Sequence, residues 1–173
     1  YNMGDNLQGW GDFNIIRANI ARFDYDERKR AVMLITGAMN PMHLGHIDTL
    51  TRARRCLENN SYCVLGGFIS PSHQEYVNDK MASSPEPGDN YAFSYVIRAE
   101  CVERTLFCSD FIGCGNCEIS QEGFRDFPNV VKSLQRAIDK IEDISIKGQK
   151  CRVFYVCGMD HYRANIQSPE NIT

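Results

Sequence analysis

Two histidines, separated by two residues, stand between an apolar run and a segment with helical spacing. The run 31–36 is short and apolar, and His43 and His46 follow it after the turn residues Gly37 and Pro41. A helix beginning just after His43 would place both imidazoles at its N-terminus, where unpaired backbone N–H groups and the helix dipole favour anions. Imidazoles also hydrogen-bond phosphate oxygens and offset charge that develops in phosphoryl transfer. The pattern predicts a phosphate site, with solvated loop histidines as the alternative.

The segments around the histidines favour the phosphate site. Residues 31–36 are typical of a buried strand, and residues 44–58 carry apolar side chains at helical spacing until Asn59 and Asn60 end the pattern. In such a strand–loop–helix, backbone N–H groups near Ala38 and Met39 would bind a phosphate. Gly45 would let a nucleotide approach the helix backbone closely.

Residues 37–46, Gly-Ala-Met-Asn-Pro-Met-His-Leu-Gly-His, resemble the G-x-x-x-P-x-H-x-G-H signature of the nucleotidylyltransferase superfamily. Within it, the chain is most similar to nicotinamide or nicotinate mononucleotide adenylyltransferases. Three later segments resemble that family in the same order, and the similarity spans roughly residues 30 to 166. They are Ser70–Tyr76, Arg98–Asp110 and the strand end Val-Cys-Gly-Met-Asp at 156–160.

The alternation of expected elements predicts an α/β fold with a parallel sheet, and the resemblance implies its Rossmann-like three-layer form. Strands are expected over 31–36, 61–69, 110–112 and 151–157, and helices over 12–23, 44–58, 91–106 and 128–141. Ligands of such sheets lie at the carboxyl ends of strands, where Gly37, Ser70 and Gly158 fall. We expect residues 1–30 to be an N-terminal extension, residues 31–173 to form the nucleotidylyltransferase domain, and the polar loop 81–90 to act as a substrate lid.

The resemblance implies transfer of AMP from ATP to a pyridine mononucleotide, a step of NAD biosynthesis that releases pyrophosphate. The attacking phosphate is already an anion, so the site needs no general base, and His43 and His46 would bind the triphosphate. Mg²⁺ would arrive with ATP, held mainly by phosphate oxygens and water, and no protein ligand is assigned to it. The expected partners are therefore ATP and a phosphorylated small-molecule acceptor.

Other residues have weaker signals. Ser70, Lys80 and Arg98 are expected to bind substrate, Lys80 through the acceptor's phosphate, although a solvated lysine and a surface arginine are the alternatives. Gly158 and Asp160 are expected at the nucleotide, with Asp160 bonding a ribose hydroxyl or the adenine amine. Helix capping is the alternative for that aspartate.

Three further features bear on packing. The glycine pair Gly66-Gly67 would allow a close backbone approach near the end of the second strand. Phe68 and Tyr76 are open between packing and base stacking. The helix expected over 12–23 would serve as a packing element or, as the alternative, as a contact for a partner.

Two departures from the family leave the acceptor and the activity open. Related enzymes have a tryptophan near segment 115–118, whereas the single tryptophan here is Trp10, and Phe124 or Phe127 would have to replace it. Their late Ile-Ser-x-Thr-x-x-Arg phosphate clamp has no counterpart before Thr173, which indicates a truncated chain or a degraded activity. The alternatives are a cytidylyltransferase acting on a phosphorylated alcohol and a non-catalytic nucleotide-binding module.

Composition narrows the class of protein. A net charge of −3 gives no bulk attraction to nucleic acid, and no apolar run is long enough for a membrane span. The eight cysteines lie mostly in apolar segments, so we expect reduced, buried side chains and, by default, a cytoplasmic location. The Cys-x-x-Cys at 114–117 could bind zinc or serve redox chemistry, and a homo-oligomer stays open.

Overall fold

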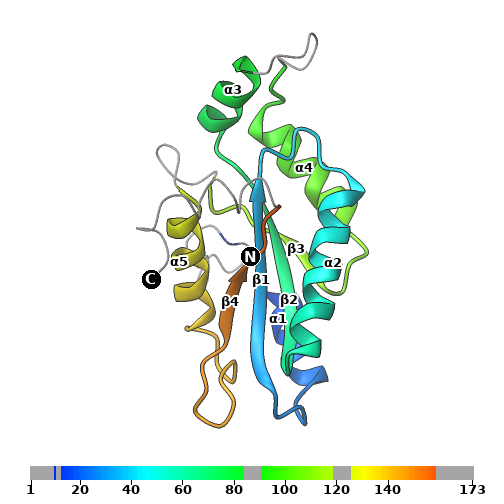
Figure 1. Ribbon diagram of the computed structural model, residues 1–173, viewed down its shortest axis with the longest axis vertical. Coiled ribbons are helices and arrows are strands. Elements are labelled where there is room, and N and C mark those ends of the chain that lie inside the picture. The colour runs from blue at the N-terminus through cyan, green and yellow to red at the C-terminus, as the bar shows by residue number, and fades with distance from the viewer. Residues whose placement is uncertain (1–9, 11–12, 84–90, 119–125, 159–173) are drawn as a thin grey trace, which may run out of the picture.

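The computed structural model describes Trp10 and residues 13–83, 91–118 and 126–158. All four strands run parallel in one sheet of order β3-β2-β1-β4, with helices on both faces (Figure 1). This confirms the predicted α/β, Rossmann-like arrangement. In chain order the elements are α1 (Asn14–Arg22), β1 (Lys29–Gly37), α2 (Leu44–Asn59), β2 (Tyr62–Pro71), α3 (Gln74–Ala82), α4 (Tyr95–Leu106), β3 (Ile112–Cys114), α5 (Phe127–Ile138) and β4 (Arg152–Tyr155).

Strand β1 is buried on both faces because successive side chains point to opposite sides of a sheet. Val32 and Leu34 pack into the hydrophobic cluster that includes α1 and α5. Met33 and Ile35 pack on the other side into the cluster that includes α2 and α4. Figure 1 shows α5 on one side of the sheet and α2 and α4 on the other, which makes the three layers.

Helix α1 packs against the sheet at an irregularity in β2. The β1–β2 register shifts between Ala31 and Val32, so Leu65 of β2 lacks a counterpart in the ladder. The buried Asn19 of α1 donates from Nδ2 to the Leu65 carbonyl oxygen at 2.9 Å. A Cβ on Gly66 would lie 2.8 Å from Cδ1 of Ile16, which confirms the predicted close approach at the glycine pair of this strand. The described residues of the N-terminal helix therefore have the expected packing role.

The structure differs from the sequence prediction mainly after β2. Helix α3 occupies residues for which no element was predicted, α4 begins at Tyr95 instead of Tyr91, and β3 lies two residues later than expected. Among the side chains of α3, only Val77 is buried, so this helix lacks the apolar stripe that reveals a helix in a sequence. Most of the expected lid, residues 84–90, lies outside the described residues.

Trp10 is a core residue. Its side chain is fully buried, its ring meets Phe68 edge to face with centroids 6.0 Å apart, and its Nε1 donates to the Ser133 hydroxyl at 3.1 Å. A Cβ on Gly115 would lie 2.8 Å from the indole ring. The indole therefore packs beside the segment where the family's tryptophan was sought, but inside the core. Phe68 is a core residue with it, which decides between the two roles left open for that ring.

We predict that Trp10→Ala lowers the free energy of unfolding by about 3–5 kcal/mol, because it leaves a large cavity and an unpaired Ser133 hydroxyl. Urea denaturation measures the change. Tyr25→Ala, at a side chain that is 96% exposed, is the control and should change stability by less than about 0.5 kcal/mol. A loss below about 1 kcal/mol for the tryptophan variant would contradict its place in the core.

Candidate functional site

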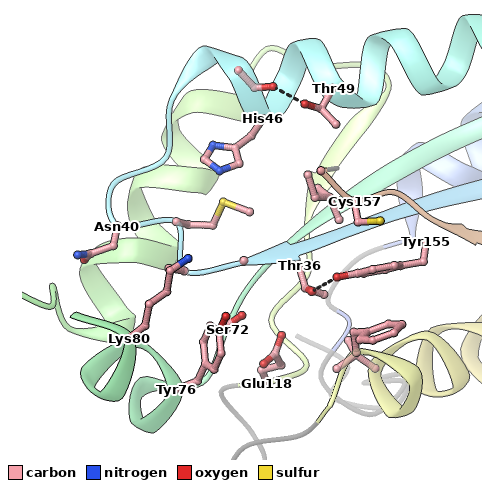
Figure 2. A pocket seen from close by; sticks show the side chains of 18 of the residues that line it. Thr36, Asn40, His46, Thr49, Ser72, Tyr76, Lys80, Glu118, Tyr155 and Cys157 are labelled. Atoms are coloured by element: carbon pink, nitrogen blue, oxygen red, sulfur yellow. Dashed lines mark hydrogen bonds between the residues drawn. The ribbon is translucent and has the colours of Figure 1, made fainter. Parts of the chain in front are cut away.

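A cleft of about 850 Å³ opens at the carboxyl ends of β1 and β4 (Figure 2). This is the edge where the sequence placed ligand binding. Most of the described residues predicted for nucleotide or substrate binding line it, together with others that the sequence did not single out. The predicted residues in its lining are Gly37, Ala38, Met39, His43, Gly45, His46, Lys80 and Gly158.

His43 and His46 close the first turn of α2 upon each other. His43 is the N-cap residue, and its Nδ1 accepts the Gly45 N–H at 3.2 Å. In return, the backbone N–H of His43 donates to Nδ1 of His46 at 3.2 Å. Their ring centroids lie 3.9 Å apart, and Figure 2 shows the His46 ring pointing from α2 into the cleft. The two imidazoles predicted at a helix N-terminus are therefore there, side by side.

This hydrogen bonding sets the tautomer of both rings. A neutral imidazole has one N–H, and an Nδ1 that accepts a backbone N–H cannot carry it. Nδ1 of His46 also lies 3.2 Å from the His43 carbonyl oxygen, but that oxygen already accepts the His46 backbone N–H at 3.0 Å, whereas the His43 N–H needs an acceptor. Each neutral ring therefore holds its proton on Nε2, which leaves two N–H donors directed beyond the helix terminus.

The charge state of His46 follows from its surroundings. Burial, and then the neighbouring His43, lowers the pKa of His46 below its ordinary value of 6.5. His46 is consequently mostly neutral near pH 7, the state in which the tautomer assignment holds.

Gly45 has a structural reason different from the expected one. A Cβ there would lie 2.9 Å from Nδ1 of His43, so the missing side chain lets that ring fold back over the helix terminus. Met39 in the preceding loop has a φ of 48°, the left-handed region that non-glycine residues seldom occupy, while its side chain is buried in the core. The loop between β1 and α2 is thus held in one conformation by its own packing.

Helix α3 forms a second wall of the cleft. Tyr76 and Lys80 both line it, and Figure 2 shows the Lys80 amine directed toward the loop that follows β1. His73 caps the helix through Nδ1, which accepts the Glu75 N–H at 3.3 Å. The lysine and the paired histidines therefore face one cleft from two different elements.

Ser70 and Arg98 lie behind the wall and do not line the cleft. Both are buried, and the Arg98 guanidinium donates to the carbonyl oxygens of Ala38, Ser72 and Phe93 at 2.7, 2.9 and 3.1 Å. The observed partners of Arg98 are therefore protein groups that hold the cleft together. Direct contact of Ser70 or Arg98 with substrate stays a prediction.

Glu118 is a buried carboxyl group in the cleft wall that the sequence did not predict. Its Oε2 accepts the His73 N–H at 3.0 Å and its Oε1 accepts the Ser70 hydroxyl at 3.4 Å. Burial raises the pKa of this carboxyl to about 7, although both hydrogen bonds and the nearby Arg98 favour its ionised form. A lone glutamate after a Cys-x-x-Cys has no sequence signal for burial, so only the fold reveals it.

A third wall is aromatic and was also not predicted. Phe127 at the start of α5 stacks on Tyr155 of β4, with ring centroids 4.7 Å apart and planes inclined by 20°. The Tyr155 hydroxyl lies 3.0 Å from the Thr36 hydroxyl at the end of β1. Phe127, Tyr155 and the neighbouring Asp126 line the cleft opposite α3. Phe127 is one of the two phenylalanines considered as a replacement for the missing tryptophan, and Phe124 lies outside the described residues.

Asp160, predicted at the nucleotide, also lies outside the described residues. Within the part of the chain that the structure describes, no three His, Cys, Asp or Glu side chains gather in a metal-binding arrangement. Cys117 is buried in the core, and burial raises the pKa of the Cys114 thiol to about 12, so that thiol stays protonated at neutral pH. The Cys-x-x-Cys therefore lacks the thiolate character that zinc binding or redox chemistry requires. No helix in the described ranges combines the length and apolarity that crossing a bilayer demands.

The chain matches no family model. It is similar to curated nicotinamide/nicotinic acid mononucleotide adenylyltransferases. It is 27% identical to the one from Oryza sativa subsp. japonica over 134 residues, which are 78% of this chain and 49% of that protein. Over 58 residues, 33% of this chain and 19% of the relatives, it is 36% and 34% identical to the proteins named adenylyltransferase 2 from Xenopus tropicalis and Rattus norvegicus. The chain thus spans about half the length of the rice relative and less of the others.

We predict that replacing Glu118 by glutamine becomes more favourable to stability as pH rises. The folded protein holds a proton on Glu118 up to about pH 7, whereas an unfolded glutamate loses it near its ordinary pKa of 4.5. The contribution of Glu118 to stability is therefore largest at low pH and falls as pH rises through that window. The glutamine side chain cannot ionise, so the stability of Glu118→Gln relative to wild type should increase by up to about 3 kcal/mol between pH 5 and pH 8.

Urea denaturation at the two pH values measures this difference. Glu142→Gln, at an exposed position, is the matched control and should show the same small effect at both. A Glu118→Gln effect that does not change with pH would mean that the buried carboxyl ionises normally.

Proposed function

We propose that this chain is a nucleotidylyltransferase domain that transfers AMP from ATP to the phosphate of a pyridine mononucleotide and releases pyrophosphate. The observation that carries the proposal is the pair of Nε2–H donors on His43 and His46 at the N-terminus of α2, in a cleft that also receives Lys80. The similarity to proteins named mononucleotide adenylyltransferases supports the choice of substrates.

The two histidines would bind the triphosphate. Their Nε2–H groups, the backbone N–H groups of the first turn of α2 and the helix dipole all attract the same anion. As pyrophosphate leaves, negative charge builds on the bridging oxygen, and donors already in position stabilise it without reorganising. A bound polyphosphate also favours the charged form of His46, so we expect nucleotide binding to take up protons near neutral pH.

The acceptor would lie between α3 and the aromatic wall. Lys80 offers a cation for its phosphate, and the stacked rings of Phe127 and Tyr155 offer a flat apolar surface for its base. The acceptor's phosphate is itself the nucleophile, so catalysis consists of alignment and charge stabilisation.

Mg²⁺ would enter as part of the substrate. Because the described side chains form no cluster of three metal-binding groups, its ligands would be phosphate oxygens and water, which suits an ion that keeps much of its hydration shell. The metal would neutralise phosphate charge, while the histidines and Lys80 position the two substrates.

We predict that His46→Ala lowers turnover by at least about a hundredfold, because it removes a donor to the charge that develops on the leaving group. The assay follows pyrophosphate release with Mg²⁺, ATP or CTP as donor, and nicotinamide mononucleotide, nicotinate mononucleotide or a phosphorylated alcohol as acceptor. Asp48→Ala, an exposed change on the same helix, is the control and should keep wild-type turnover.

Three outcomes would contradict the proposal in different ways. Turnover with CTP and a phosphorylated alcohol alone would make the protein a cytidylyltransferase. Nucleotide binding without pyrophosphate release from any pair would make it a non-catalytic binding module. Unchanged turnover in the His46→Ala variant would remove the assigned role of the histidine.

A further inference from the structure

Helix α3 carries Lys80 and Tyr76 into the cleft, yet it has little apolar packing. It buries a single side chain, Val77, whereas α4 and α5 each bury five. Figure 1 shows α3 beyond the carboxyl edge of the sheet, away from the helices that cover the two faces. A helix with so few buried contacts is expected to open locally unless other interactions hold it.

A closed set of hydrogen bonds holds α3, and one of its anchors is Asn40 of the loop after β1. The Asn40 amide group donates from Nδ2 to the Tyr91 carbonyl oxygen at 2.8 Å, and its Oδ1 accepts the Phe93 N–H at 2.8 Å. Its Nδ2 also lies 3.2 Å from the Met81 sulfur near the end of α3. One side chain therefore joins the phosphate loop to the backbone that precedes α4 and to the last turn of α3.

The other half of the set runs through the Phe93 carbonyl oxygen. This oxygen accepts from Nε of Arg98 at 3.1 Å and from Nε2 of Gln74 at 3.3 Å. Arg98 also donates to the Gln74 side chain at 3.3 Å and to the Ala38 carbonyl oxygen at 2.7 Å. Asn40, Phe93, Gln74 and Arg98, which we call the bracket, thus connect both ends of α3 to the loop between β1 and α2.

We propose that Asn40 is a positioning residue that fixes the place of α3, and with it Lys80, relative to the phosphate loop. The bracket is built almost entirely from backbone carbonyl and N–H groups and amide or guanidinium side chains, so its hydrogen bonds define distances more strictly than loose apolar packing would. The meaning of this distance for catalysis rests on the proposed function. Lys80 would hold the acceptor's phosphate and the histidines would hold the triphosphate, so the bracket sets how far apart the nucleophile and the α-phosphorus lie.

Hydrogen–deuterium exchange tests the positional claim without any reaction. In the Asn40→Ala variant we expect faster exchange over α3 and at the Phe93 amide, with unchanged exchange in β1 and β2. Asn78→Ala is the matched control, because the Asn78 side chain has its hydrogen bond to Gln74 of the same helix, and it should leave Phe93 protected. Asn40→Asp keeps the acceptor for the Phe93 N–H and loses the donor to Tyr91, so its effect should be intermediate.

Steady-state kinetics test the consequence for the reaction. Misplacing reacting groups by about 1 Å costs as much as a hundredfold, so Asn40→Ala should lower kcat about tenfold to a hundredfold, with KM for ATP near its wild-type value. A variant that matches Asn78→Ala in both exchange and kcat would overturn the inference. So would faster exchange spread evenly over the sheet, since that would be a general loss of stability. A wild-type protein without adenylyl transfer would instead contradict the proposed function, and the exchange result would still decide whether Asn40 holds α3.

Discussion

The site depends on how the first turn of α2 is closed. A helix N-terminus needs acceptors for its free N–H groups, and here histidine rings supply them. Because each Nδ1 of His43 and His46 is occupied by a backbone N–H, each Nε2–H is left for a ligand. One set of hydrogen bonds therefore begins the helix, fixes the tautomers and places the two rings 3.9 Å apart. The absence of a Cβ at Gly45 makes room for this arrangement.

The walls of the cleft differ in how firmly they are built. The histidines and the aromatic wall stand on β1, β4, α2 and α5, whose side chains belong to the two buried clusters. Helix α3 contributes only Val77 to the buried side chains, and polar groups at its first turn, Glu118 and Arg98, hold it in place. A rigid side for one substrate and a more weakly packed side for the other suits a site that must admit two ligands and release two products.

The fold was readable from the sequence wherever apolar spacing is strong. Strand β1 and helix α2 lie within two residues of their predicted ends, because a continuous apolar run and a helical stripe are unambiguous signals. Helix α3 has a single buried residue and β3 is three residues long, so neither has enough pattern to be recognised or placed. The site divides for a related reason. His43, Gly45 and His46 are close in sequence and share one helix start, whereas Glu118 and Tyr155 reach the cleft only because β4 pairs with β1 and segment 115–118 follows β3 along the same edge.

The most direct test is the ¹⁵N spectrum of the histidine rings, recorded without ligand and then with Mg²⁺ and ATP. We predict that the neutral rings of His43 and His46 hold their protons on Nε2, and that both Nε2 signals shift when the nucleotide is added. Protons on Nδ1 in the free protein, or Nε2 signals that ignore saturating nucleotide, would contradict the role given to the two rings.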